Sequence, residues 1–171
     1  KDRVLICYIK SPFYNKNKII KHCNVIESRI IAETFFKSGY SVDVVDYRCM
    51  RKIDYSKYSV IFGFGHPFRR AFIHKANSIK ILYLTGCLAY FSNFIEAKRV
   101  REFNKRHDSF LTPEIEAYWP SVFPIAASNA VMHTGNSWTK STYSAFKQNF
   151  FTIPVMSIID EDYKPLTFHK N

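Results

Sequence analysis

Residues 22–46 constrain the fold of this chain more than any other stretch. Their first part places apolar side chains along one arc of a helix and charged side chains along the opposite arc. Gly39 then stands where the end of a helix requires a left-handed residue, and residues 42–46 read as a buried strand. Together with the apolar run at residues 4–9, this predicts a strand–helix–strand crossover, the unit of a parallel sheet. Ligands of such sheets bind beyond the carboxyl ends of the strands, so we expect functional residues in the loops that follow strands.

Further strands alternate with helices along most of the chain. Four more apolar runs predict strands at residues 59–64, 80–85, 130–134 and 150–154. A helix is expected to begin with Asn93 as its N-cap, and a shorter helix at about Ser137. Residues 108–124 show no periodicity and read as a long excursion. The pattern predicts one α/β domain with a Rossmann-like, doubly wound, mainly parallel sheet, the first strand at its centre and helices on both faces.

The chain is strongly basic. Its 171 residues carry 25 Lys and Arg against 14 Asp and Glu, which gives a formal net charge of +11. The basic residues cluster in residues 48–52, 69–70 and 98–106. This balance indicates an anionic partner: nucleic acid, an acidic membrane surface or a phosphate-bearing substrate. The hydrophobic content of 47% is that of a globular protein, and no apolar stretch is long enough to span a bilayer.

Several common sites are missing from the sequence. The loop after the first strand, residues 10–21, has no glycine that would let the backbone approach the pyrophosphate of NAD or FAD. There is no GxxxxGK[ST] phosphate loop and no GxSxG turn around a nucleophilic serine. The four cysteines and six histidines lack the spacing of metal ligands. The sequence therefore predicts no metal site, and reduced thiols rather than disulfides.

Two histidines lie where functional side chains are expected. His22 and His66 each occupy a point where a loop meets a helix near the carboxyl end of a predicted strand. A functional and a structural role are equally open for both. His133 differs because it lies inside an apolar strand, where a hydrogen-bonded core residue is expected rather than a base.

Three segments, in their order and spacing, resemble a known family. They are His22-x-Asn24-x-x-Glu27 with its continuation to residue 47, Tyr83-Leu84-Thr85-Gly86 followed by Asn93-x-x-Glu96, and Gly135-Asn136-x-x-Thr139-x-Ser141-Thr142-Tyr143. They resemble the N-terminal domain of bacterial GT-B glycosyltransferases, and the resemblance covers residues 1–157. In that family two Rossmann-like domains face each other across a cleft, one holding the acceptor and the other the nucleotide-sugar donor. The resemblance implies that residues 158–171 begin the interdomain linker and that the donor domain lies outside this chain.

The resemblance also implies a function. The domain would bind a glycan or lipid-linked acceptor that receives a sugar from a nucleotide-sugar donor, and it would bind no cofactor and be inactive alone. The catalytic candidates are His22, Glu27 and His66. Helical geometry places His22 at or before the N-cap of the first helix and Glu27 in its first turn. The acceptor and cleft contacts are assigned to Ser11, Asn24, Gly65, Thr85, Gly86, Asn93, Asn136, Thr139 and Lys140.

Two other interpretations stay open. A non-catalytic basic α/β module would hold nucleic acid or another polyanion, although the aromatic residues lie in apolar runs rather than in stacking patterns beside Arg and Lys. A flavodoxin-like or response-regulator-like domain would need a first loop rich in Ser and Thr, which this chain lacks. For the glycosyltransferase interpretation, nucleic acid is not expected as a partner. The expected location is then cytoplasmic, with peripheral attachment to an anionic membrane face as an option.

Overall fold

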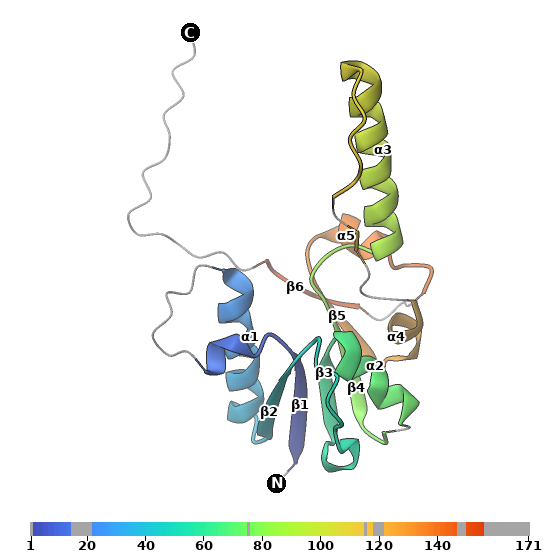
Figure 1. Ribbon diagram of the computed structural model, residues 1–171. Coiled ribbons are helices and arrows are strands. Elements are labelled where there is room, and N and C mark those ends of the chain that lie inside the picture. Colours follow the sequence, from blue (N-terminus) through green and yellow to red (C-terminus); the bar gives the residue numbers. More distant parts are fainter. Residues whose placement is uncertain are drawn as a thin grey trace.

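The computed structural model describes residues 2–14, 22–74, 76–114, 116–117, 122–146 and 150–155. This described part contains a six-stranded sheet in which all strands run parallel (Figure 1). The strands are β1 (Arg3–Tyr8), β2 (Ser41–Asp46), β3 (Val60–Gly63), β4 (Ile79–Leu84), β5 (Ala130–Thr134) and β6 (Phe150–Ile153). The α-helices are α1 (Cys23–Lys37), α2 (Gly65–Ile73), α3 (Ala89–His107), α4 (Val122–Ala127) and α5 (Ser137–Ser141), and the 3-10 turns are η1 (Ser11–Phe13) and η2 (Tyr55–Lys57). The predicted α/β fold is confirmed, while the linker assigned to residues 158–171 lies outside the described residues.

Helices cover both faces of the sheet. On one face Ala32 of α1 belongs to the same apolar core as Val4 of β1. On the other face Phe68 of α2 and Ile125 of α4 share a core with Leu5 of β1. Neighbouring residues of β1 therefore face opposite cores, which is why this strand is apolar almost throughout.

The strand order is β2-β1-β3-β4-β5-β6. From β1 the chain first adds β2 on one side of β1. It then crosses to the other side of β1 to form β3, and the later strands are added in that second direction. Since parallel crossovers are right-handed, this reversal explains why α1 lies on one face and the helices of the later crossovers on the other. The prediction of a central first strand was wrong: β1 is second from the edge, because only β2 lies beyond it. The reversal places the topological switch between β1 and β3, where open α/β sheets form their ligand crevice.

Two glycines are required by the backbone at the ends of elements. Gly39 ends α1 with a φ of +94°, as its position in the sequence predicted. Gly63 ends β3 with a φ of +118°, and a Cβ atom at this position would lie 2.1 Å from the carbonyl oxygen of Cys7 in β1. Only a shift of the backbone could relieve that contact, so Gly63 sets how closely β3 approaches β1.

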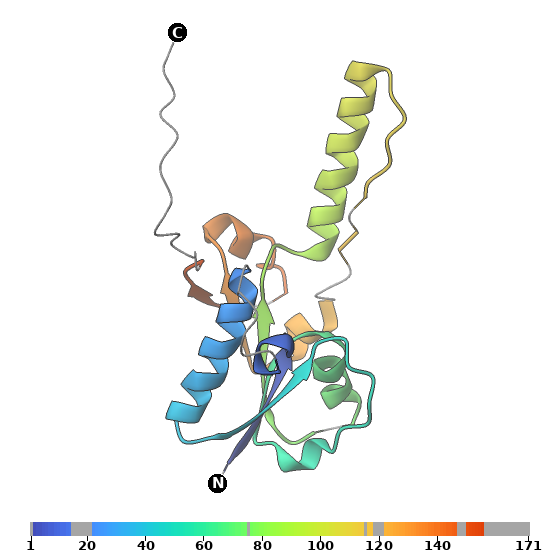
Figure 2. The same cartoon turned by 60° about the vertical axis from the view of Figure 1, so that its left-hand side comes forward.

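Helix α3 projects away from the rest of the domain (Figure 2). The prediction that it begins with Asn93 was wrong, because it begins at Ala89. Asn93 lies one turn inside the helix, where its side chain donates to the carbonyl oxygen of Ala117 at 3.0 Å and accepts from the N–H of Ala117 at 2.8 Å. Asparagine often caps helices, but Asn93 instead holds the segment around Ala117, where the chain returns along α3. Within the predicted excursion, residues 109–114 and 116–117 contain no helix or strand, but its last three residues, 122–124, lie in α4.

His133 is a buried core residue of β5, as predicted, but among the described residues only one of its two ring nitrogens has a hydrogen-bond partner. Its Nε2 lies 2.9 Å from the Oγ1 atom of Thr152, its register partner in β6. Burial lowers the pKa of His133, because the charged imidazolium is poorly solvated there.

Replacing Gly63 by alanine should destabilise the domain by about 3 kcal/mol or more, because the new methyl group would collide with the backbone of β1. Gly39→Ala is the matched control, since its φ is also positive but nothing lies within 4 Å of the added Cβ. Its cost should be about 1–2 kcal/mol, from backbone strain alone. Urea unfolding of the two variants measures the difference, and equal costs would contradict the close approach of β3 to β1.

The free energy of unfolding should decrease as the pH falls from about 7 to about 5. The folded state resists protonation of His133, whereas the unfolded chain takes up that proton once the pH drops below the ordinary histidine value of 6.5. His133→Gln removes the titration and keeps a side-chain nitrogen for Thr152. The variant should therefore lose less stability over this range in urea titrations at both pH values, and an equal loss would exclude His133 as the cause.

Candidate functional site

The carboxyl edge of the sheet collects most of the predicted site residues. Because all strands are parallel, the loops after β1, β3, β4 and β5 open at the same edge. The candidates there are Ser11 after β1, His22, Asn24 and Glu27 in the first part of α1, Gly65 and His66 after β3, Thr85 and Gly86 after β4, and Asn136, Thr139 and Lys140 after β5. His22, His66, Gly86 and Asn136 therefore follow strands at one edge of the sheet.

A tight turn joins β3 to α2 beside the topological switch. Gly65 opens α2 with a φ of +85°, and a Cβ atom there would lie 2.1 Å from the carbonyl oxygen of Tyr47. The N–H of His66 donates to the same oxygen at 2.8 Å. The ring of Phe64 packs with its centroid 5.7 Å from that of Tyr8 and 5.1 Å from that of Tyr47. Gly65 is thus needed for a backbone contact, and aromatic rings pack together beside the switch.

His22 is the N-cap of α1, as predicted. Its Nδ1 accepts a hydrogen bond from the N–H of Asn24 at 3.2 Å. With Nδ1 accepting the cap bond, a ring that carries its proton on Nε2 can donate a hydrogen bond to a ligand.

Glu27 lies further along α1 than predicted, because the first turn of the helix contains no acidic residue. Its carboxylate accepts a hydrogen bond from the hydroxyl of Tyr8 at 2.7 Å. The carboxylate also lies near Tyr83 of β4. Burial, and then the carboxylate of Glu27, raises the pKa of both tyrosines. The hydrogen bond from Tyr8 therefore joins α1 to β1.

The sequence reasoning did not assign roles to Tyr8 or Tyr83. Each residue is almost fully buried, at 1% exposure, and the hydroxyl of Tyr8 reaches the carboxylate of Glu27. A signal was present, since a tyrosine near the carboxyl end of an apolar strand brings a polar atom to the functional edge. Which acid it meets depends on how α1 packs on the sheet.

The loop after β4 is hydrogen-bonded to the region of α5. The hydroxyl of Tyr143 donates to the carbonyl oxygen of Gly86 at 2.6 Å. The N–H of Leu88 donates to Oγ1 of Thr142 at 3.1 Å. The loop after β4 and the end of α5 are therefore held together although they lie more than fifty residues apart in sequence. Thr85, next to Gly86 in this loop, is exposed.

Asn136 is the N-cap of the short helix α5. Its Oδ1 accepts from the N–H of Thr139 at 3.0 Å and lies 3.3 Å from Oγ1 of Thr139. Both polar side chains are thus engaged with each other. Lys140 follows in the same helix with an exposed side chain, so α5 adds a cation to this edge.

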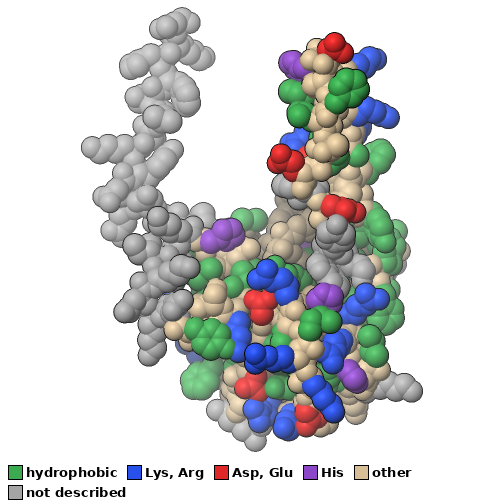
Figure 3. Space-filling view, viewed as in Figure 1, with side chains coloured by type: hydrophobic (Ala, Val, Ile, Leu, Met, Phe, Trp, Pro, Cys, Tyr) green, Lys and Arg blue, Asp and Glu red, His purple; other side chains and the backbone are tan. Residues whose placement is uncertain are grey.

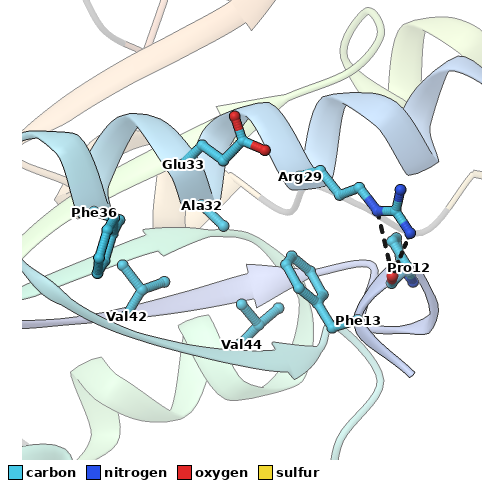
Figure 4. A pocket seen from close by; sticks show the side chains of 8 residues that line it. All are labelled: Pro12, Phe13, Arg29, Ala32, Glu33, Phe36, Val42 and Val44. Carbon is cyan, nitrogen blue, oxygen red and sulfur yellow. Dashed lines mark hydrogen bonds between the residues drawn. The ribbon is translucent and has the colours of Figure 1, made fainter. Parts of the chain in front are cut away.

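Two of the predicted site residues, Asn93 and Ser11, belong to parts of the structure with another role. Asn93 holds the chain that returns along α3. Ser11 begins η1, which is fixed to α1 because Arg29 donates to the carbonyl oxygen of Pro12 at 2.8 Å. A cavity of about 600 Å³ opens there between α1 and β2, and its lining is mostly apolar (Figure 4). None of the predicted site residues lines this cavity.

Within the described ranges, no three His, Cys, Asp or Glu side chains group as a metal site would require. The helices described there include none of the length and apolar character needed to cross a bilayer.

Glu27→Gln should lower the free energy of unfolding by about 1–2 kcal/mol, because the hydroxyl of the buried Tyr8 loses a charged acceptor. Glu33→Gln is the control on the same helix, where the carboxylate makes only an exposed contact with Lys37 at 3.9 Å. Its effect should stay below about 0.5 kcal/mol. Thermal and urea unfolding give both values, and a neutral Glu27→Gln variant would show that the Tyr–Glu contacts do not hold α1 in place.

Comparison with known proteins identifies no relative. No protein-family model matches the chain, and no curated protein or solved structure matches it either. The arrangement of residues at the carboxyl edge therefore has to carry any functional conclusion.

Proposed function

We propose that this domain is the acceptor-binding half of a GT-B glycosyltransferase that transfers a sugar from a nucleotide-sugar donor to a glycan or lipid-linked acceptor. One observation supports the proposal most. The bond from Tyr143 to Gly86 joins the second and third segments on which the resemblance rests. The first segment, beginning at His22, lies at the same carboxyl edge, where open α/β sheets bind ligands.

The groups at this edge suit a hydroxyl-bearing acceptor. In the proposed complex, the Nε2–H of His22 donates to an acceptor oxygen, and the side chain of Thr85 offers a second polar contact. Positioning an acceptor hydroxyl in line with the donor sugar removes much of the entropic barrier to transfer. The positive charge of Lys140 would stabilise the diphosphate that leaves the donor. The donor itself would be bound by the second domain of the complete protein.

Glu27 has a positioning role in this proposal, because its carboxylate accepts the hydrogen bond of the Tyr8 hydroxyl. It fixes the start of α1, and with it His22, relative to the sheet. His66 differs, because its bond to Tyr47 at the topological switch comes from the backbone N–H and does not depend on the imidazole. In this proposal the His66 side chain remains a catalytic candidate, whereas loss of Glu27 should affect stability as well as rate.

In the complete enzyme, His22→Ala should lower kcat/KM by about tenfold, because the Nε2–H contact to the acceptor is lost. His22→Asn is the informative partner variant, since asparagine keeps the helix cap but cannot reach as far. Both variants should lose activity if His22 contacts the acceptor. His74→Ala, in the residue that ends α2, is the control and should leave the rate unchanged. Full activity of His22→Asn with a loss only in His22→Ala would make the histidine a structural cap.

The chain of 171 residues should bind a glycan or lipid-linked acceptor without transferring any sugar. Amide chemical shifts measured by NMR should change at residues 22–24, 85–88 and 136–140 when the acceptor is added, and nucleotide sugars should bind weakly. Transfer by this chain alone would contradict the division into acceptor and donor halves. Tight binding of nucleic acid at the same residues would favour the polyanion-binding alternative.

A further inference from the structure

The free end of the α3 arm is the most exposed apolar point of the described structure. The arm consists of α3 and the chain that returns along it, and it stands clear of the sheet in both ribbon views (Figures 1 and 2). Phe110, just beyond the end of the helix, is 97% exposed, and its neighbour Leu111 is 57% exposed. Two neighbouring large apolar side chains are therefore exposed together at the end of the arm.

The turn that presents Phe110 is held in a defined conformation. Asp108 adopts a left-handed conformation with a φ of 45° and ends the helix. Asn104 then bonds to both sides of Phe110: its Oδ1 accepts from the hydroxyl of Ser109 at 2.9 Å and from the N–H of Leu111 at 3.0 Å. Its Nδ2 donates to the carbonyl oxygen of Leu111 at 2.8 Å.

Asn93 repeats this arrangement at the base of the arm. It donates to and accepts from the backbone of Ala117 in the same way. The two asparagines are eleven residues apart, which is close to three helical turns, so they lie on one face of α3. The arm is thus braced at both ends, and the exposure of Phe110 is a feature of a built loop.

Basic side chains surround this apolar turn. The last turn of α3 contains Lys105, Arg106 and His107, directly before the turn that carries Phe110. Acids lie near the turn as well: Asp108 ends the helix, Glu102 lies 3.9 Å from Lys98, and Glu114 lines a cavity together with Leu111. In the space-filling view, Lys and Arg side chains lie beside hydrophobic ones toward the free end of the arm (Figure 3).

We propose that this tip inserts Phe110 and Leu111 into the headgroup layer of an anionic phospholipid membrane, with Lys105 and Arg106 contacting lipid phosphates. Exposed aromatic and aliphatic side chains next to cations are the combination that binds membrane surfaces. The net charge of +11 also attracts the whole chain to an anionic membrane over a longer range. This inference is independent of the proposed sugar transfer.

The size of the tip favours a membrane over a protein partner. A stable protein interface buries about 800 Å² on each side, more than one turn with two or three apolar side chains can supply. Membrane insertion needs only a few such side chains, since the surrounding lipid adapts to their shape. Nucleic acid would use the cations, but the aliphatic Leu111 has no function in stacking on bases.

The test is co-sedimentation of the 171-residue chain with phosphatidylcholine vesicles that contain about one quarter phosphatidylglycerol. We expect binding to these vesicles and little binding to pure phosphatidylcholine. Phe110→Ser should weaken the partition coefficient by about tenfold, the factor expected when one inserted aromatic side chain is lost. The double variant Lys105→Gln and Arg106→Gln should weaken it as well, and about 0.5 M salt should suppress binding to anionic vesicles.

Matched controls separate the tip from general surface properties. Phe36→Ser removes another exposed phenylalanine, on α1, and Arg51→Gln with Lys52→Gln removes the same charge far from the arm. Both controls should bind nearly as well as the wild type, and circular dichroism should show that all variants are folded. Equal weakening by tip and control variants, or no binding to anionic vesicles, would overturn the proposal. It would also be overturned if the tip variants impaired binding to a DNA oligonucleotide but not to vesicles.

Discussion

The parallel direction of all six strands is the constraint on which the rest of the structure depends. Parallel strands cannot be joined by tight turns, so each connection must cross the sheet and most carry a helix. The strands are then covered on both faces, which explains the continuous apolar runs in β1 and β3. The same constraint brings the loops after β1, β3, β4 and β5 to one edge. Close approach of β3 to β1 is possible only because Gly63 has no side chain.

Polar side chains in this domain mostly connect elements. Glu27 joins α1 to β1 through the hydroxyl of Tyr8. Asn93 and Asn104 hold the return segment of the α3 arm, and Asn136 caps α5. These residue types would serve equally well in a binding site, so a motif containing them does not by itself distinguish a structural role from a functional one. Hydrogen-bond partners make that distinction, and they leave the Nε2 of His22 as the best candidate for contact with a ligand.

The edge of the sheet and the arm have complementary properties. The edge is fixed by backbone contacts and aromatic packing around Tyr47 and Phe64. The arm carries its exposed apolar tip away from that edge on a helix about 28 Å long, at 1.5 Å per residue. A domain that recognises an acceptor at its edge and a membrane through its arm would act close to a lipid surface. The two proposals nevertheless rest on different residues and can fail separately.

The sequence by itself determined the fold class, because periodicity is a local property. The alternation of apolar runs with a helical arc predicted the strands within one or two residues, and Gly39 correctly predicted the end of α1. It also indicated that His22 lies at a helix start and that His133 is buried. Tertiary structure alone decided the rest. The position of β1 next to the edge depends on the direction of each crossover, which no local pattern encodes. The partners of Glu27, Asn93 and Gly86 are more than fifteen residues away in sequence, so their bonds exist only once the elements have packed.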